Sequence, residues 1–219
     1  MAVAVVIAAI ATACGGSSAT PTATSEAAGL ETSTPGSTPT AEPTAQAFIN
    51  NALLDVPDMP SGWQSAFAAA SSLNLTLNLC NKHIDDSGYL AFGQTALSSG
   101  QNALLEHIAV YPADRATTVM NNTRSAFSSC TQWTATRNGQ TLTFHAAPLQ
   151  FPTLGDGTVA YTLSATGSAN APAGSQVYVV VRQGATLMTV SYLAAGTVDP
   201  ATVQNLVRNA YAKVEKAQA

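Results

Sequence analysis

The feature that most restricts the fold of this chain is a series of five strand-like segments in its second half, with no helical pattern between them. Each segment is rich in β-branched and aromatic residues, and together they span 133–136, 141–146, 158–165, 176–182 and 185–193. Gln183-Gly184 separates the last two segments, and glycine accepts the positive φ that a tight hairpin turn requires. Because parallel strands would need helical crossovers between them, the series predicts an antiparallel sheet.

Two helices, each with one apolar face, are predicted beside this sheet. Asp199-Pro200 supplies an N-cap and a first helical position, and an apolar stripe follows at positions 203, 206, 207, 210, 211 and 214. Asp114 is predicted to cap the other helix, whose apolar face runs from Ala116 through Phe127 to Cys130. The expected fold class is α+β: a single domain with a curved antiparallel sheet and helices packed on one face.

The segment from residue 47 to residue 111 is expected to complete the domain. Leucines alternate with polar residues from Leu73 to Leu79, which predicts a strand, and a further strand is predicted from Ala103 to Tyr111. A short helix is predicted for Ala47 to Leu54, which a Pro-rich turn then ends. Residues 81–100 are expected to be irregular.

The N-terminus has the pattern of a bacterial lipoprotein signal peptide. Residues 2–13 are Ala, Val, Ile and one Thr, and they end at Cys14, which small residues follow. The run is shorter than the roughly 20 residues that a helix needs to cross a bilayer. We therefore expect Cys14 to carry diacylglycerol and palmitate, anchoring an extracytoplasmic domain to the cell membrane; the alternative is an apolar segment with a cysteine by chance. The first basic residue is Lys82, so the positive segment of such a signal is expected upstream of Met1.

The segment after Cys14 is expected to be a disordered stalk. From Ser17 to Gln46 the chain is Ser, Thr, Ala, Pro and Gly with three Glu, a single Leu and the final Gln. Such a segment buries too little apolar surface to offset the entropy of ordering it. Its Ser and Thr residues beside Pro are either O-glycosylation acceptors or part of a plain spacer. The expected organisation is a signal peptide at 1–13, the lipid-bearing stalk at 14–47 and an α+β domain at 48–219.

The charge balance of the domain argues against nucleic acid as a partner. Three of the twelve acidic residues precede residue 48, which leaves nine acidic residues against eight basic ones. No basic cluster is dense enough to neutralise several phosphates. Three histidines lie far apart in the sequence, so neither a metal site nor a cofactor is expected.

Cys80 and Cys130 are the cysteines that remain once Cys14 carries a lipid. In an oxidising compartment, two such cysteines most simply form a disulfide. A reactive thiol is the alternative, but the chain contains no CxxC motif. We expect the bridge to join the helix that ends at Cys130 to the strand that ends at Cys80.

Four residues are candidates for ligand binding. Asp156 lies in the loop Leu154-Gly155-Asp156-Gly157-Thr158, which is either a tight turn with two positive-φ glycines and an Asx hydrogen bond or the mouth of a cleft. Arg182 precedes a hairpin turn and either meets an anionic ligand or pairs with a nearby carboxylate. Trp63 and Trp133 are either core anchors or the lining of an aromatic cleft.

Four segments carry a resemblance to a known family: Leu53 to Trp63, Cys130-Thr131-Gln132-Trp133, Pro148 to Tyr161, and Val179 to Tyr192. Together they resemble a family of actinobacterial, mainly mycobacterial, lipoproteins with a sensor domain. This family is similar to the extracellular domain of receptor serine/threonine kinases of the PknH type. The resemblance implies an antiparallel sheet with helices on one side and a cleft for an unknown ligand. Those kinase domains carry two disulfides, whereas only one cysteine pair is available here.

Three functions remain open at this point. The first is a cell-envelope lipoprotein, not an enzyme, whose domain binds a small or lipidic ligand or an envelope protein, with sensing as one role for this binding. The second is an envelope hydrolase, which would need a hydroxyl and a carboxylate beside His107 or His145, two histidines that could meet in space. The sequence has no GxSxG, HExxH or P-loop motif. The third is a structural or host-facing surface protein without a pocket.

Overall fold

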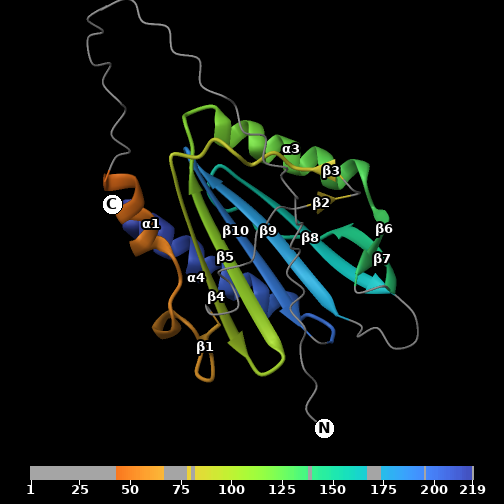
Figure 1. Cartoon of the computed structure of the whole chain (residues 1–219). Coiled ribbons are helices and arrows are strands. Elements are labelled where there is room, and N and C mark those ends of the chain that lie inside the picture. Colours follow the sequence, from red (N-terminus) through yellow and green to blue (C-terminus); the bar gives the residue numbers. More distant parts are fainter. Residues whose placement is uncertain are drawn as a thin grey trace, which may run out of the picture.

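The computed structural model describes residues 43–66, 78–79, 82–137, 140–166, 174–194 and 196–218. Its centre is an eight-stranded antiparallel sheet in the order β1-β4-β5-β10-β9-β8-β7-β6 (Figure 1). These strands are β1 (Gln64–Ser65), β4 (Ala91–Ser99), β5 (Asn102–Val110), β6 (Gln132–Arg137), β7 (Gln140–Pro148), β8 (Gly157–Thr166), β9 (Ser175–Gln183) and β10 (Thr186–Ala194). The other described elements are β2 (Asn78–Leu79), β3 (Lys82–His83), α1 (Pro43–Ala52), the 3-10 helix η1 (Val56–Asp58), α3 (Arg115–Ser129) and α4 (Pro200–Gln218).

The antiparallel sheet of the second half of the chain is confirmed. All five predicted segments are strands, and the strand predicted from Ala103 to Tyr111 is β5. The hairpin between β9 and β10 lies one residue later than predicted. Gln183 pairs with Thr186, so Gly184 and Ala185 form the turn, and Gly184 has the positive φ of 57° that such a turn requires.

Two predictions in the first half need correction. Residues 81–100 are not irregular throughout, because Ala91–Ser99 is strand β4. The alternation that would have revealed it is weakened by small residues such as Gly93, whose missing side chain lets Ile49 of α1 approach closely. Helix α1 begins at Pro43, four residues before its predicted start, so the ordered domain reaches into the predicted stalk. Of the strand predicted from Leu73, only Asn78–Leu79 falls within the described residues, as β2.

The helices cover both faces of the sheet, which corrects the prediction of one covered face. Val177, Val179 and Val181 of β9 belong to the core that contains α1 and α4. Tyr178 and Val180 of the same strand belong to the core that contains α3. Since side chains alternate along a strand, a continuous apolar run such as 177–181 requires cover on both sides.

Helix α4 closes one face as its sequence pattern predicts. Asp199 caps it, because its carboxylate accepts hydrogen bonds from the backbone N–H groups of Ala201 (3.2 Å) and Thr202 (3.1 Å). The predicted apolar stripe is buried except at Tyr211, which is half-buried. Tyr211 donates a hydrogen bond to the side-chain oxygen of Gln183 at 2.9 Å, so the helix also holds the β9–β10 hairpin.

Helix α3 covers part of the other face. Its predicted apolar face is buried, and Phe127 stacks on Tyr161 of β8 with a centroid distance of 4.1 Å. Asp114 occupies the predicted N-cap position, but its side chain makes no capping hydrogen bond. Cys130 is buried where the helix ends and is disulfide-bonded. Cys80 lies outside the described residues, so the Cys80–Cys130 pairing stays a prediction.

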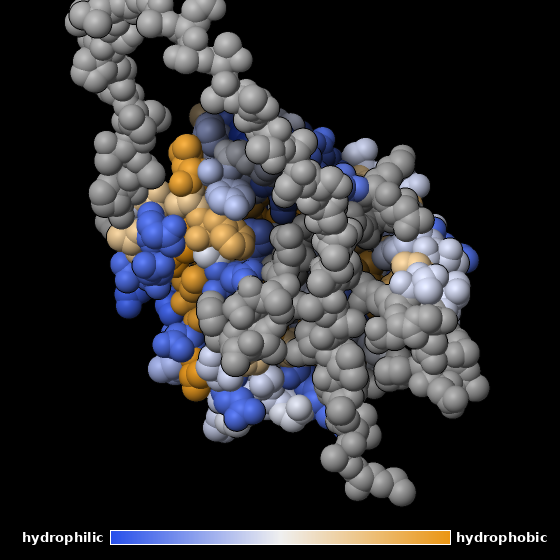
Figure 2. All heavy atoms as spheres, viewed as in Figure 1, coloured by the Kyte–Doolittle hydropathy of each residue, from blue (hydrophilic) through white to orange (hydrophobic). Residues whose placement is uncertain are grey.

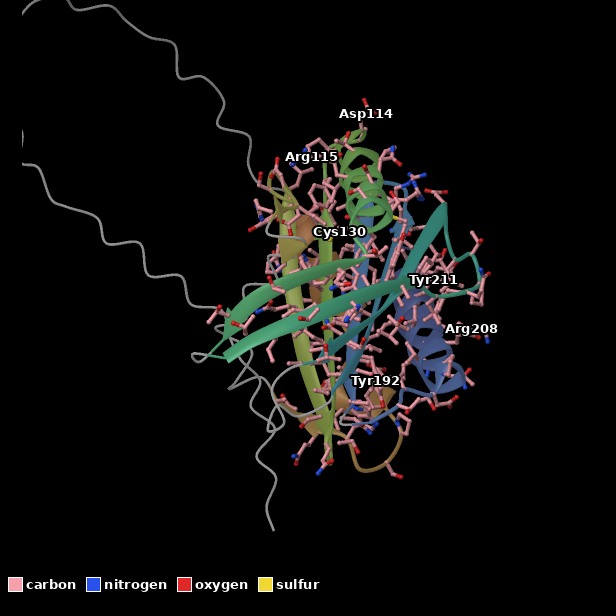
Figure 3. All side chains as sticks on the ribbon, turned by 90° about the vertical axis from the view of Figure 1, so that its right-hand side faces the viewer. Asp114, Arg115, Cys130, Tyr192, Arg208 and Tyr211 are labelled. Atoms are coloured by element: carbon pink, nitrogen blue, oxygen red, sulfur yellow. The ribbon has the colours of Figure 1, made fainter. Side chains whose placement is uncertain are left out.

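The sheet is strongly twisted. In Figure 3 the arrows of β6 and β7 lie across the direction of β4 and β5. Neighbouring strands rotate by about 20–25° relative to one another, so the twist accumulates over eight strands. As a result, the end of the sheet at β6 and β7 curves away from the end at β1 and β4.

Candidate functional site

Two hollows lie on the face of the sheet that α3 covers. The first, called here the inner hollow, lies between α3 and the middle of the sheet and has a volume of about 30 Å³. Its polar lining consists of Asp86, His107, Tyr111, Thr123, Tyr178 and Thr189. This volume holds one or two water molecules, so the inner hollow is too small for an organic ligand.

Burial shifts the pKa values of the groups around the inner hollow in the direction that favours their uncharged forms. Burial lowers the pKa of His107 to about 4, and the imidazole ring lies edge-on to Phe92 at a centroid distance of 4.5 Å. Burial also raises the pKa values of Tyr178, Tyr111 and Asp86. The hydroxyl of Tyr111 donates a hydrogen bond to the backbone oxygen of Asp86 at 2.8 Å. The inner hollow is therefore a small space inside the core, and burial opposes charge on the groups that line it.

The histidines of the hydrolase hypothesis do not come together. His107 is on β5 and His145 is on β7, and β10, β9 and β8 lie between these strands. Four strand spacings separate them by about 19 Å. Within the described residues, no serine or threonine hydroxyl is hydrogen-bonded to either imidazole. The described residues also contain no group of three potential metal ligands.

The second hollow, called here the outer hollow, lies between the first turns of α3 and the start of β8. It offers about 210 Å³ to solvent molecules and is lined by Thr117, Met120, Asn121, Arg124, Asp156, Gly157 and Arg182. Thr117, Asn121 and Arg124 follow one another at helical spacing, so they form one stripe of α3. Gly157 pairs directly with Arg182 across β8 and β9. The outer hollow thus combines a helix surface with two neighbouring strands.

Asp156 and Arg182 are the two predicted ligand-binding residues that the structure brings together. Arg182 Nη1 lies 3.2 Å from Asp156 Oδ2. Arg182 therefore pairs with a nearby carboxylate, which is one of the two interpretations given for it above. The backbone N–H of Gly184 donates to the same carboxylate at 2.7 Å. Because Asp156 and Arg182 are both partly exposed, with 45% and 24% of their side chains accessible, their ion pair stabilises by at most about 1 kcal/mol.

The loop around Asp156 differs from the predicted Asx turn. The N–H donor to its carboxylate belongs to Gly184, 28 residues away, and is not local. Of the two glycines predicted to have positive φ, Gly155 does, at 55°, and Gly157 does not. A Cβ atom at residue 155 would lie 2.4 Å from the backbone oxygen of Arg182, so this position has no room for a side chain. The close approach of the Arg182 backbone oxygen therefore explains why residue 155 is a glycine more fully than the turn alone does.

Trp63 and Trp133 do not meet. Trp63 precedes β1 at one edge of the sheet, and its ring lies 6.4 Å from that of Tyr192. Trp133 is on β6 at the other edge, stacked on Phe144 at 5.2 Å. Both are half-buried against the core, so each serves as an anchor, and they cannot line one cleft.

The carboxylate of Glu106 is a buried polar group that the sequence patterns did not reveal. This residue on β5 is fully buried, and its Oε2 accepts a hydrogen bond from the backbone N–H of Leu54 at 2.6 Å. Its other oxygen has no partner among the described residues. Burial raises the pKa of Glu106 to about 8. The available signal was a single acidic residue inside the apolar strand Leu104-Leu105-Glu106-His107-Ile108.

Exposed apolar surface is limited in the part of the chain that the structure describes. Tyr89 and Leu90, just before β4, are the exposed large hydrophobic residues there, with 48% and 61% accessibility. Figure 2 shows hydrophobic surface on the side of α1 and the start of β4. Among the described helices, none is both long and apolar enough to span a bilayer.

Comparison with known proteins relates the fold to a solved extracellular domain. No protein-family model matches the chain, and no curated protein matches it. The crystal structure of the extracellular domain of PknH from Mycobacterium tuberculosis superposes with a TM-score of 0.52 and 12% identity. The alignment covers 77% of this chain and 94% of that domain. At this identity the likeness establishes a shared fold. The antiparallel sheet that the sequence resemblance implied is confirmed, whereas the helices lie on both faces of the sheet and not on one.

Proposed function

We propose that this protein is a lipid-anchored protein of the cell envelope whose α+β domain binds a small or lipidic ligand, or a protein partner, outside the cytoplasm, without catalysing a reaction. The observation that carries the proposal is the shared fold with an extracellular domain, that of PknH. The lipoprotein pattern that ends at Cys14 independently supports a location of the domain outside the cytoplasm. Because folds host many functions, the binding role also needs a site of its own.

The outer hollow is the candidate for such a site. It is concave, its floor includes the apolar side chain of Met120, and a few polar groups converge on it. In contrast, the separation of His107 and His145 gives the hydrolase hypothesis no support. The arrangement of these residues therefore favours a binding function over a catalytic one.

Native mass spectrometry of the protein purified from its host envelope in a neutral detergent tests the binding role. We expect a co-purified molecule of defined mass, released when the protein is denatured. An apo mass that persists after incubation with envelope extract would contradict small-molecule binding. That result would favour the structural or partner-binding alternative.

Fatty-acid labelling tests the anchor. In cells fed a clickable palmitate analogue, we expect the wild-type chain to incorporate the label and Cys14→Ala to lose it completely, because the thiol is the predicted attachment point. Ser17→Ala, three residues away, is the matched control and should keep the label. Equal labelling of Cys14→Ala and the wild type would overturn the lipoprotein assignment.

A further inference from the structure

We propose that the outer hollow binds an oxyanion, a carboxylate or phosphate group of a small soluble molecule, between Arg124 of α3 and Arg182 of β9. This inference names the ligand chemistry of the binding function proposed above and rests on that function. An anionic ligand was one interpretation of Arg182 from its sequence position, whereas Arg124 lies 58 positions earlier in the chain and was not a candidate.

The charges that line the outer hollow favour an anion. Its ionisable residues are Arg124, Arg182 and Asp156, which leaves an excess of one positive charge. Asp156 is already engaged, because its carboxylate accepts from the N–H of Gly184 and pairs with Arg182. Among the described residues its ion pair is with Arg182 and not with Arg124. The positive charge of Arg124 is therefore not neutralised by a residue of the hollow.

Arg124 has hydrogen-bond donors to spare. Its side chain is exposed, and in the described part of the chain it donates one hydrogen bond, from Nη1 to Asn121 Oδ1 at 2.8 Å. A guanidinium carries five N–H donors in a planar fork that matches the two oxygens of a carboxylate or phosphate. The bond to Asn121 orients this fork at the hollow and leaves the other donors for a ligand.

Gly157 keeps the space between the strand and Arg124 open. A Cβ atom at this position would lie 3.9 Å from Met120 Cε and 4.0 Å from Arg124 Nη2. Its cross-strand neighbour is Arg182, so Gly157 lies beside the strand position of one arginine and close to the guanidinium of the other. The volume of about 210 Å³ is below the roughly 300–1,000 Å³ of pockets for drug-sized ligands. A small molecule, or one anionic group of a ligand, fits this space.

The test is a calorimetric titration of the full chain, extracted in a neutral detergent, with inorganic phosphate and, separately, with succinate. We expect saturable binding of at least one of the two probes, weakened by added NaCl because the attraction is electrostatic. Arg124→Gln should weaken it by about tenfold or more, the loss expected for one charge-assisted hydrogen bond. Gly157→Ala should also weaken it, because the added methyl group narrows the hollow without backbone strain.

Arg208→Gln is the matched control. Arg208 is exposed on the outward side of α4 (Figure 3), so its loss removes one positive charge far from the outer hollow and should leave binding unchanged. Arg182→Gln is not used, because it also breaks the ion pair with Asp156. Thermal unfolding of each variant verifies that the domain remains folded.

The outcomes separate this inference from the proposed function. Binding that is lost in Arg124→Gln and retained in Arg208→Gln supports the oxyanion site, and the probe that binds identifies phosphate or carboxylate. Absent binding, or binding that Arg124→Gln leaves intact, overturns it. If native mass spectrometry still finds a bound molecule in that case, the binding function stands and the ligand is held elsewhere.

Discussion

The wild-type domain is expected to lose stability as the pH rises, and the Glu106→Gln variant is expected not to show this loss. Burial raises the pKa of Glu106 from 4.5 to about 8, and Lys213 and Asp58 are the charged groups that act on it. The folded state therefore holds a proton that the unfolded chain releases near pH 4.5. The stabilising contribution of this proton is complete below pH 4.5 and is lost progressively as the pH rises to about 8.

Urea unfolding at several pH values between 4.5 and 9 measures the effect. Relative to that of the wild type, the free energy of unfolding of Glu106→Gln should rise by about 3–5 kcal/mol over this pH range, because each unit of pKa shift corresponds to about 1.4 kcal/mol. Glutamine keeps the side-chain oxygen that accepts from Leu54. Glu215→Gln on the exposed side of α4 controls for the removal of one carboxylate. Parallel pH profiles for the wild type and Glu106→Gln would rule out a raised pKa.

Reduction of the predicted Cys80–Cys130 disulfide is expected to destabilise the domain by about 4 kcal/mol, the chain-entropy value for a closed loop of about 50 residues. The bridge would fasten the end of α3, where Cys130 is buried. Urea unfolding with and without a reductant measures the loss, in a chain that carries Cys14→Ala so that two cysteines remain.

The double variant Cys80→Ala/Cys130→Ala in the same background is the control, and its stability should not respond to the reductant. Peptide mapping without reduction should recover the Cys80 and Cys130 peptides joined. Recovery of both as free thiols would exclude the bridge, even if the reductant alters stability by another route.

Local periodicity was sufficient to predict most of the secondary structure. The stripe of α4 and the five strands of the second half follow from spacings of 3.6 and 2 residues, which depend only on neighbours in the sequence. Strand β4 was missed because the pattern of Ala91–Ser99 is carried by small residues. The placement of α3 and α4 on opposite faces was also missed, although the apolar run at 177–181 indicated two buried sides.

The site could be predicted only in part, because its contacts are long-range. Asp156 and Arg182 were singled out from local turn chemistry, but their contact depends on the pairing of β8 with β9. Arg124 looks like any polar residue on a solvent-facing helix turn until α3 is placed over Gly157. For Glu106, the strand pattern shows the residue, but only the packing of Leu54 above it shows how its carboxylate is held.

The two-sided burial of β9 limits where this domain can be engineered. One residue inserted between 177 and 181 would turn every following side chain of the strand to the opposite face. Side chains that now pack on α3 would then face α1 and α4, and the reverse. The turn at Gly100 and Gln101 between β4 and β5 has no such restriction, since both residues are exposed and a Cβ atom at Gly100 would have no atom within 4 Å. A fluorescent reporter or an affinity tag therefore belongs in that turn.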